Sequence, residues 1–163
     1  MSEVQKVTHN IDPVFDENSR ILILGSMPSV KSREVNFFYG NKQNRFWKVI
    51  SKVFEENEPV SVEEKKKFLL KNKIALWDVI KECDIVGSDD STIKNVVVND
   101  LNLILEKCEI KEIFANGKTA EKYYNLFLKN KLSKEIILLP STSPANASYN
   151  FEKLYSFWKI IKF

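Results

Sequence analysis

The chain has few of the residues that build metal centres and disulfide frameworks. Its 163 residues include one histidine, His9, and two cysteines, Cys83 and Cys108, which lie far apart in the sequence and form no CxxC pair. Zinc and iron–sulfur sites need several clustered thiolates or imidazoles. We therefore expect no metal site, and we predict that both cysteines are reduced and packed.

Glycine and long apolar runs are also scarce. The four glycines form neither a GxGxxG nor a Walker-type loop, which argues against enzymes that hold nucleotide cofactors in such loops. No apolar stretch approaches the length needed to cross a bilayer, and the first twenty residues lack the continuous apolar segment of a signal peptide. We expect a cytoplasmic protein with no cofactor and no membrane contact.

The residues that are present suit a globular protein. The chain has a mass of 19.0 kDa, and 44% of its residues are hydrophobic and 12% aromatic, which is enough for a substantial core. We predict a single domain over residues 1–163, acting as a monomer. The net charge of +3 and the pI near 8.7 suit a polyanionic partner, although many basic proteins have none.

Strand-like and helix-like runs alternate along the chain. Short apolar runs predict four buried strands, at residues 20–25, 74–80, 112–117 and 135–140. Apolar positions at helical spacing predict helices from residue 46, over 62–73, after residue 117 and from residue 151. This alternation favours an α/β fold, with helices over a mainly parallel sheet of about four strands.

Polar segments follow three of these strands, and ligands bind beyond the carboxyl ends of parallel strands. GSMPSVKS occupies residues 25–32, ANGKTA residues 115–120 and LPSTSPAN residues 139–146. The polar stretch GSDDST, residues 87–92, is interpreted as a loop. A parallel sheet would bring the three polar segments into one cleft with FFYGNKQNRFWKVI, residues 37–50, which combines aromatics with amide side chains.

Taken in order, these segments resemble the uracil-DNA glycosylase superfamily, and most closely its DNA-deoxyinosine (hypoxanthine-DNA) glycosylase branch. The resemblance spans nearly the whole chain: GSMPSVKS, FYGNKQNRFWKVI, ALWDVI with the downstream GSDD, ANGKTA, and LPSTSPANASYNFEKL. It implies a three-layer α/β/α sandwich. It also implies hydrolysis of the bond between a deaminated base, chiefly hypoxanthine, and deoxyribose during base-excision repair, after the nucleotide is flipped out of the duplex.

Within this resemblance, amide side chains are the candidate catalytic groups. Mismatch-specific uracil glycosylases carry a water-positioning Asn where this chain has Met27, whereas the deoxyinosine branch places its essential amide in the NRFW segment, matched here by Asn44. Asn44 also suits the N-cap of the helix that follows. Asn41 is the second catalytic candidate, at a position where relatives often carry His.

Four residues are predicted to bind the base. Tyr39 matches an aromatic that stacks on the flipped base in mismatch-specific relatives, and its alternative is an ordinary core aromatic. Asn116 matches an amide that contacts the base edge, although Asn-Gly is also a plain turn signal. Ser26 and Met27 belong to the segment that could meet the base carbonyl through its backbone amides.

The remaining candidates are predicted to contact DNA. The serines of the first polar segment can reach phosphates, and so can four cations that flank the pocket segments, Lys31, Arg45, Lys48 and Lys118. The 141–145 loop resembles the loop that grips the strand near the lesion, although Ser143-Pro144 is also a good helix start. The residues predicted to bind DNA are Ser29, Lys31, Ser32, Arg45, Lys118, Ser141, Thr142, Ser143, Pro144 and Ala145.

Two other functions fit the same residues. Uracil excision from mismatched or single-stranded DNA needs the same chemistry in a pocket of different width. A non-catalytic nucleic-acid-binding domain would keep the scaffold and release no base. No lysine stands out as a Schiff-base nucleophile, so we expect hydrolysis without strand cleavage.

Overall fold

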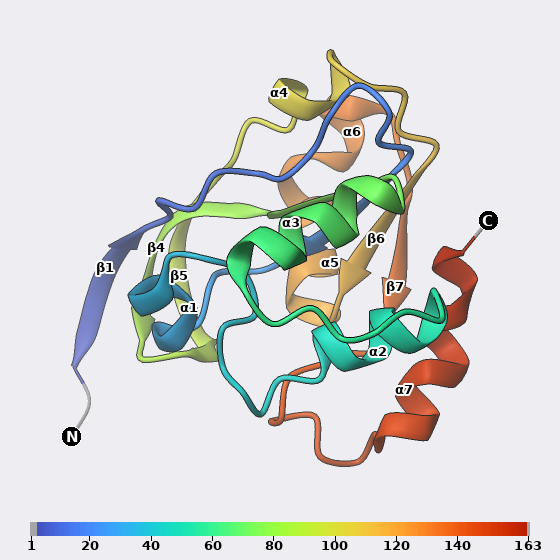
Figure 1. Cartoon of the computed structure of the whole chain (residues 1–163). Helices are drawn as coiled ribbons and strands as arrows, with labels where there is room; N and C mark the ends of the chain where they lie inside the picture. The colour runs from blue at the N-terminus through green and yellow to red at the C-terminus, as the bar shows by residue number, and fades with distance from the viewer. Residues whose placement is uncertain (1–2, 163) are drawn as a thin grey trace.

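The four-stranded sheet at the centre of the molecule is parallel throughout. A computed structural model describes residues 3–162 (Figure 1), and in it the strands run in the order β3-β2-β6-β7, each parallel to its neighbour. The strands are β2 Ile21–Gly25, β3 Ile74–Asp78, β6 Glu112–Asn116 and β7 Ile136–Leu139. The predicted α/β fold around a short parallel sheet is confirmed.

Strands β2 and β3 are almost entirely apolar because helices cover the sheet on both faces. Every residue of β2 and β3 is buried, as expected for strands that contact helices on each side. In Figure 1, α3 (Val62–Lys71) lies in front of the sheet and α5 (Lys118–Phe127) lies behind it. The helices therefore hold the strand ends in place.

Two helices near the carboxyl edge of the sheet pack on each other. α2 (Phe46–Val53) contacts α7 (Phe151–Trp158), and the rings of Phe46 and Trp158 meet edge to face at 5.8 Å, a favoured aromatic geometry. Both residues are fully buried. The shorter helices are α1 Val30–Val35, α4 Asn102–Leu105, α6 Lys129–Leu132 and the 3-10 turn Lys159–Ile161.

A second sheet, which the sequence patterns did not predict, is antiparallel. Its strands are β1 Val4–Thr8, β4 Ile80–Val86 and β5 Asp89–Val98, in the order β1-β4-β5. The predicted loop at 87–92 is wrong from residue 89 onward, because only the Gly87–Ser88 turn precedes β5. The strand predicted over 74–80 is in fact divided, with β3 ending at Asp78 and β4 beginning at Ile80.

The order of the strands creates a crevice at the carboxyl edge. The chain passes from β2 to a neighbour on one side, β3, and from β6 to a neighbour on the other side, β7. Ligands bind where such connections diverge. Gly25 and Asn116, the last residues of β2 and β6, stand at this point. Within residues 3–162, no helix has both the length and the apolar content that a bilayer crossing requires.

Candidate active site

A cavity of about 520 Å³ opens at the carboxyl edge of the parallel sheet. Several parts of the chain line it: the end of β2 with the segment after it, α1 with the connection to α2, the ends of β3 and β6, the β4–β5 turn with the start of β5, and the loop after β7. Its lining consists of Gly25, Ser26, Met27, Pro28, Ser29, Ser32, Phe38, Tyr39, Asn41, Asn44, Asp78, Ser88, Asp89, Asp90, Ser91, Asn116, Ser143, Pro144 and Ala145.

Most residues singled out from the sequence meet in this cavity. The two catalytic candidates and the four base-binding candidates all line it, and so do five of the ten DNA-binding candidates. Those five are Ser29, Ser32, Ser143, Pro144 and Ala145. The other five, Lys31, Arg45, Lys118, Ser141 and Thr142, lie outside the lining. Proximity is thereby established, whereas the individual roles stay predictions.

A chain of hydrogen bonds fixes the amide of Asn44. Its Oδ1 accepts from the backbone N–H of Phe46 at 2.9 Å and from the hydroxyl of Thr142 at 2.8 Å. Because a backbone N–H can only donate, the amide oxygen must face Phe46. Nδ2 makes no hydrogen bond within residues 3–162. Asn44 therefore supports the start of α2 and still has free donors in the cavity lining.

Thr142 couples this amide to a second one. Its hydroxyl accepts from Nδ2 of Asn116 at 3.0 Å, and its backbone N–H donates to Oδ1 of Asn116, also at 3.0 Å. Thr142 is fully buried. Asn116 therefore holds the 142 loop with one donor and one acceptor position, and its second N–H and second lone pair are left for a ligand.

Tyr39 is held against the core. Its ring stacks on Phe46, with 4.1 Å between centroids, and its φ of 52° lies in the left-handed region, which is strained for a bulky side chain. The hydroxyl is buried and has no hydrogen-bond partner of good geometry in the described part of the chain. Burial, followed by the charge of Asp78, raises the pKa of this hydroxyl, while the nearby Asn116 side chain lowers it.

The β4–β5 turn places carboxylates at the rim of the cavity. The hydroxyl of Ser26 donates to Oδ2 of Asp90 at 2.8 Å. Although Asp90 is exposed to solvent, the protein atoms around its carboxyl desolvate it and raise its pKa; hydrogen bonds from Ser26 and Thr119 oppose this shift, and Asp78 and Asp89 add to it. The predicted base-binding residue Ser26 therefore already has a partner.

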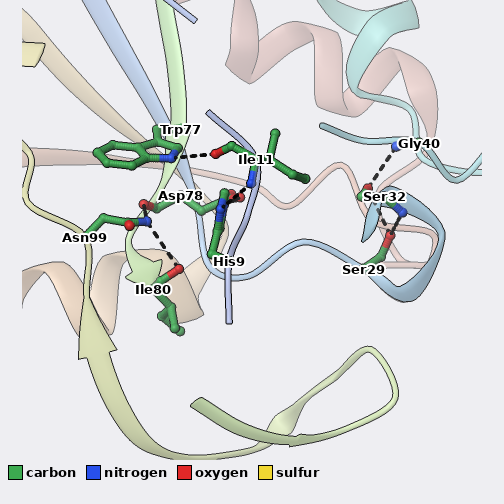
Figure 2. Close-up of polar contacts among 9 residues, drawn as sticks. All are labelled: His9, Ile11, Ser29, Ser32, Gly40, Trp77, Asp78, Ile80 and Asn99. Carbon is green, nitrogen blue, oxygen red and sulfur yellow. Dashed lines mark hydrogen bonds and ion pairs between the residues drawn. The ribbon is translucent and has the colours of Figure 1, made fainter. Parts of the chain in front are cut away.

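The serines at the start of α1 hold the neighbouring backbone. Ser29 Oγ caps α1 by accepting from the N–H of Ser32 at 3.1 Å, and Ser32 Oγ accepts from the N–H of Gly40 at 2.9 Å (Figure 2). These bonds tie α1 to the segment that carries Tyr39 and Asn41. The Oδ1 of Asn41 accepts from the N–H of Gln43 at 2.9 Å.

The guanidinium of Arg45 is occupied by backbone carbonyls. It donates to Thr142 O at 3.4 Å, to Ser143 O at 2.8 Å, to Asn146 O at 3.3 Å, and also to Tyr149 O. These bonds use its Nε and both terminal nitrogens. The geometry favours a positioning role, in which Arg45 fixes the loop after β7 beside the cavity, over the phosphate contact expected from the sequence.

The other cations lie at the surface around the cavity. Lys31 is exposed and pairs with Glu34 at 3.4 Å. Lys118, also exposed, lines a neighbouring hollow of about 550 Å³ together with Ser141, and Ala145 borders both hollows. This arrangement leaves Lys118 and Lys31 accessible to a polyanion.

Sequence reasoning missed Asp78 and His9. Asp78 ends β3 and lines the cavity, and its Oδ2 lies 2.7 Å from Nε2 of His9. The carboxyl end of a buried strand is the same signal that pointed to Asn116, so Asp78 was recognisable. His9, which precedes β2 by more than ten residues, carried no such signal.

The fold and the cavity together define an α/β domain with a polar ligand site at its topological switch point. A more particular assignment comes from the family model described as "Uracil DNA glycosylase superfamily", which matches residues 13–162. The chain belongs to this superfamily, as the ordered motifs had indicated.

Similar proteins come from two species of Methanosarcina. A protein of Methanosarcina acetivorans named hypoxanthine DNA glycosylase is 38% identical over 139 residues, which cover 84% of this chain and 87% of the relative. A protein of the same name from Methanosarcina barkeri is 32% identical, covering 82% and 85%. The solution structure of a candidate uracil DNA glycosylase from M. acetivorans superimposes with a TM-score of 0.79 at 35% identity and covers 96% of both chains.

Proposed function

We propose that this protein is a monofunctional DNA glycosylase that removes hypoxanthine from DNA in base-excision repair. The proposal rests on the cavity at the switch point, which gathers Asn44, Tyr39 and Asn116, and on relatives named hypoxanthine DNA glycosylase at 32% and 38% identity. We further propose that residues 1–163 act as one cytoplasmic domain, as a monomer and without metal or cofactor.

Excision begins when the nucleotide leaves the duplex. Flipping costs a few kcal/mol, and less for a mispaired base such as hypoxanthine. Pro144 and Ala145 are exposed at the cavity edge, where they can approach the gap that the flipped base leaves. Lys118 and Lys31 are exposed and can contact phosphates on either side.

Bond cleavage places positive charge on the sugar and negative charge on the departing base, as in other glycoside hydrolyses. Asn44 offers amide N–H donors rather than its oxygen, because that oxygen already accepts two hydrogen bonds. An amide is a poor base, so its function is to hold the attacking water by donation. The water oxygen bonds to the sugar carbon as the bond to the base breaks, and the proton that the water loses balances the negative charge of the departing base. The products are free base and an abasic site, with no strand break.

The experiment that tests this proposal measures release of free base from labelled duplexes containing deoxyinosine or deoxyuridine, without added metal. Asn44→Ala removes the donors from the cavity, so we expect its rate to fall roughly 10²–10³-fold. Asn130→Ala serves as the matched control, because Asn130 is an exposed amide on α6, outside the cavity. Thermal unfolding and DNA binding verify that each variant stays folded.

Two outcomes would contradict the proposal. Lesion-independent DNA binding with no release of any base would leave a non-catalytic binding domain on the same scaffold. Release of uracil with no release of hypoxanthine would support the glycosylase chemistry but show that the substrate is uracil. Equal rates for wild type and Asn44→Ala would instead remove Asn44 from the mechanism.

A further inference from the structure

The carboxylate of Asp78 is a charged acceptor at the inner end of the cavity. Asp78 is 4% exposed, yet it lines the cavity. Its Oδ1 approaches Gly25 so closely that a Cβ added there would lie 2.3 Å from it, which explains why only glycine fits at the end of β2. Oδ1 makes no hydrogen bond within the described chain. An acceptor is thus held in the wall without a partner.

The other oxygen of Asp78 is fixed by His9. Figure 2 shows the His9 ring beside Asp78, with Nε2 at 2.7 Å from Oδ2. The backbone N–H of Ile11 donates to Nδ1 of the same ring at 3.2 Å. Because Nδ1 accepts, the proton of a neutral ring must be on Nε2, which donates to Asp78. The carboxylate therefore cannot turn Oδ2 toward the cavity without losing this bond.

Backbone contacts around the pair make it rigid. Nδ2 of Asn99 donates to the carbonyl of Asp78 at 2.9 Å and to that of Ile80 at 3.3 Å, and the indole N–H of Trp77 donates to the carbonyl of Ile11 at 3.1 Å (Figure 2). The Trp77 bond joins β3 to the segment carrying His9, and the two Asn99 bonds fix the backbone where β3 ends and β4 begins. A buried frame of this kind is able to select ligands by hydrogen-bond polarity.

We propose that the His9–Asp78 pair selects deaminated bases by presenting a fixed acceptor to a ring N–H. Hypoxanthine has a proton on N1 and uracil has one on N3, whereas adenine N1 and cytosine N3 carry lone pairs. A flipped base is read on this edge. Oδ1 accepts the ring N–H of the deaminated base and repels the lone pair of the parent base. This inference rests on the proposed glycosylase function and names its specificity residue.

The hydroxyl of Tyr39 lies behind this acceptor. It is 3.0 Å from the position that a Cβ on Gly25 would take, and protein atoms cover it. The carboxylate of Asp78 is therefore the group of this pair that meets the base edge.

The first test uses the wild-type protein and one methylated base, 1-methylhypoxanthine. Release is compared between duplexes containing hypoxanthine and 1-methylhypoxanthine, which lacks the N1 proton. A buried acceptor binds poorly to a ligand that lacks the matching donor. We therefore expect kcat/KM for 1-methylhypoxanthine to be lower than that for hypoxanthine by roughly 10²-fold or more. Similar rates on the two bases would overturn the inference while leaving the glycosylase function intact.

The second test reverses the polarity with Asp78→Asn. Since Nε2 of His9 donates, the new amide directs its oxygen toward His9 and its NH2 toward the cavity. We expect the preference for hypoxanthine over 1-methylhypoxanthine to fall at least about 10-fold, and the preference over adenine to fall with it. Asp12→Asn, the same change at an exposed site outside the cavity, is expected to change neither ratio.

The outcomes separate selection from other roles. If Asp78→Asn slows all bases equally, Asp78 acts on the water or on folding and the inference fails. If wild type releases no base, the proposed function fails, and equilibrium binding of free hypoxanthine, 1-methylhypoxanthine and adenine then tests the inference by itself. Hypoxanthine binding at least about 10-fold tighter than the other two would support it, and equal binding would overturn it.

Discussion

The two sides of the cavity differ in how the chain holds them. The inner wall, formed by Gly25, Asn44, Asp78 and Asn116, is set by strand ends and by buried hydrogen bonds, several of them to Thr142 behind it. The outer rim, residues 87–92, comprises the β4–β5 turn and the start of β5; it is largely exposed and carries two carboxylates, Asp89 and Asp90. Groups that must meet a base edge stand on the rigid side.

The two sides of the cavity therefore suit different tasks: the inner wall suits precise contact with a base, and the rim affects the approach of DNA. Inner-wall groups have partners that fix their direction, as catalysis and base selection require. The rim carboxylates are exposed beside the cavity, where under the proposed function they would weaken the approach of DNA phosphates by repulsion. Changes to the inner wall should therefore alter stability and chemistry strongly, whereas changes to the rim should alter affinity and pH response mildly.

The largest stability effect expected from a single change outside the lining is that of Arg45→Ala. Four carbonyls of the loop after β7 would lose a charged donor. Since hydrogen bonds to charged groups are among the stronger ones, we expect the free energy of unfolding to fall by about 2–3 kcal/mol. Thermal unfolding should show Tm lowered by roughly 5–10 °C.

Lys48→Ala provides the control for Arg45, because Lys48 is an exposed cation on the same helix. Its loss should leave Tm nearly unchanged. The salt dependence of DNA binding distinguishes the two possible roles of Arg45. An unchanged Tm together with a salt slope reduced by about 0.9 would instead support the phosphate contact.

Sequence patterns predicted the inner wall far better than the rim. The strand ends carrying Gly25 and Asn116 were found because buried parallel strands are continuous apolar runs, and polar residues stand out where they stop. β5 is mostly exposed, with alternation weakened by Asp and Asn, which strands disfavour. Residues 87–92 were therefore interpreted as a loop, and the rest of the hairpin was not predicted.

Partners of side chains were harder to predict than positions. Arg45 stands beside the predicted site, and a cation there fits a phosphate contact; only the folded loop after β7 brings four carbonyls to it. The pairing of His9 with Asp78 joins residues 69 positions apart. Sequence spacing contains no information about such contacts.

A smaller effect, a gain in stability, is expected for Tyr39→Phe. The substitution keeps the ring on Phe46 and removes a buried hydroxyl that lacks a partner. Because an unsatisfied buried polar atom destabilises the fold, we expect a gain of about 0.5–1 kcal/mol in unfolding free energy. Hypoxanthine release, measured by single-turnover kinetics, should stay close to that of the wild type, because the buried hydroxyl does not reach the base. A loss of stability would show that the hydroxyl is bonded in solution.

The smallest effects are expected at the rim, where two neighbouring carboxyls should respond to pH with opposite sign. Desolvation raises the pKa of Asp90, so the folded state binds its proton more tightly than the unfolded state does, and its contribution to stability is lost as pH rises through the folded pKa. Hydrogen bonds from Ser91 lower the pKa of Asp89, so its contribution is present above the unfolded pKa and lost as pH falls through the folded value.

Asp90→Asn should therefore raise Tm slightly at pH 7, and Asp89→Asn should lower it slightly. Both differences from wild type should shrink toward pH 3, because protonation then removes the charge that each substitution deletes. Thermal unfolding of the three proteins at the two pH values measures the signs. Since either substitution removes a negative charge from the approach path, both should also tighten DNA binding by a similar small factor. Equal Tm shifts of the same sign would mean that the turn responds to total charge, and that the contacts of Ser26 and Ser91 do not distinguish its two carboxyls.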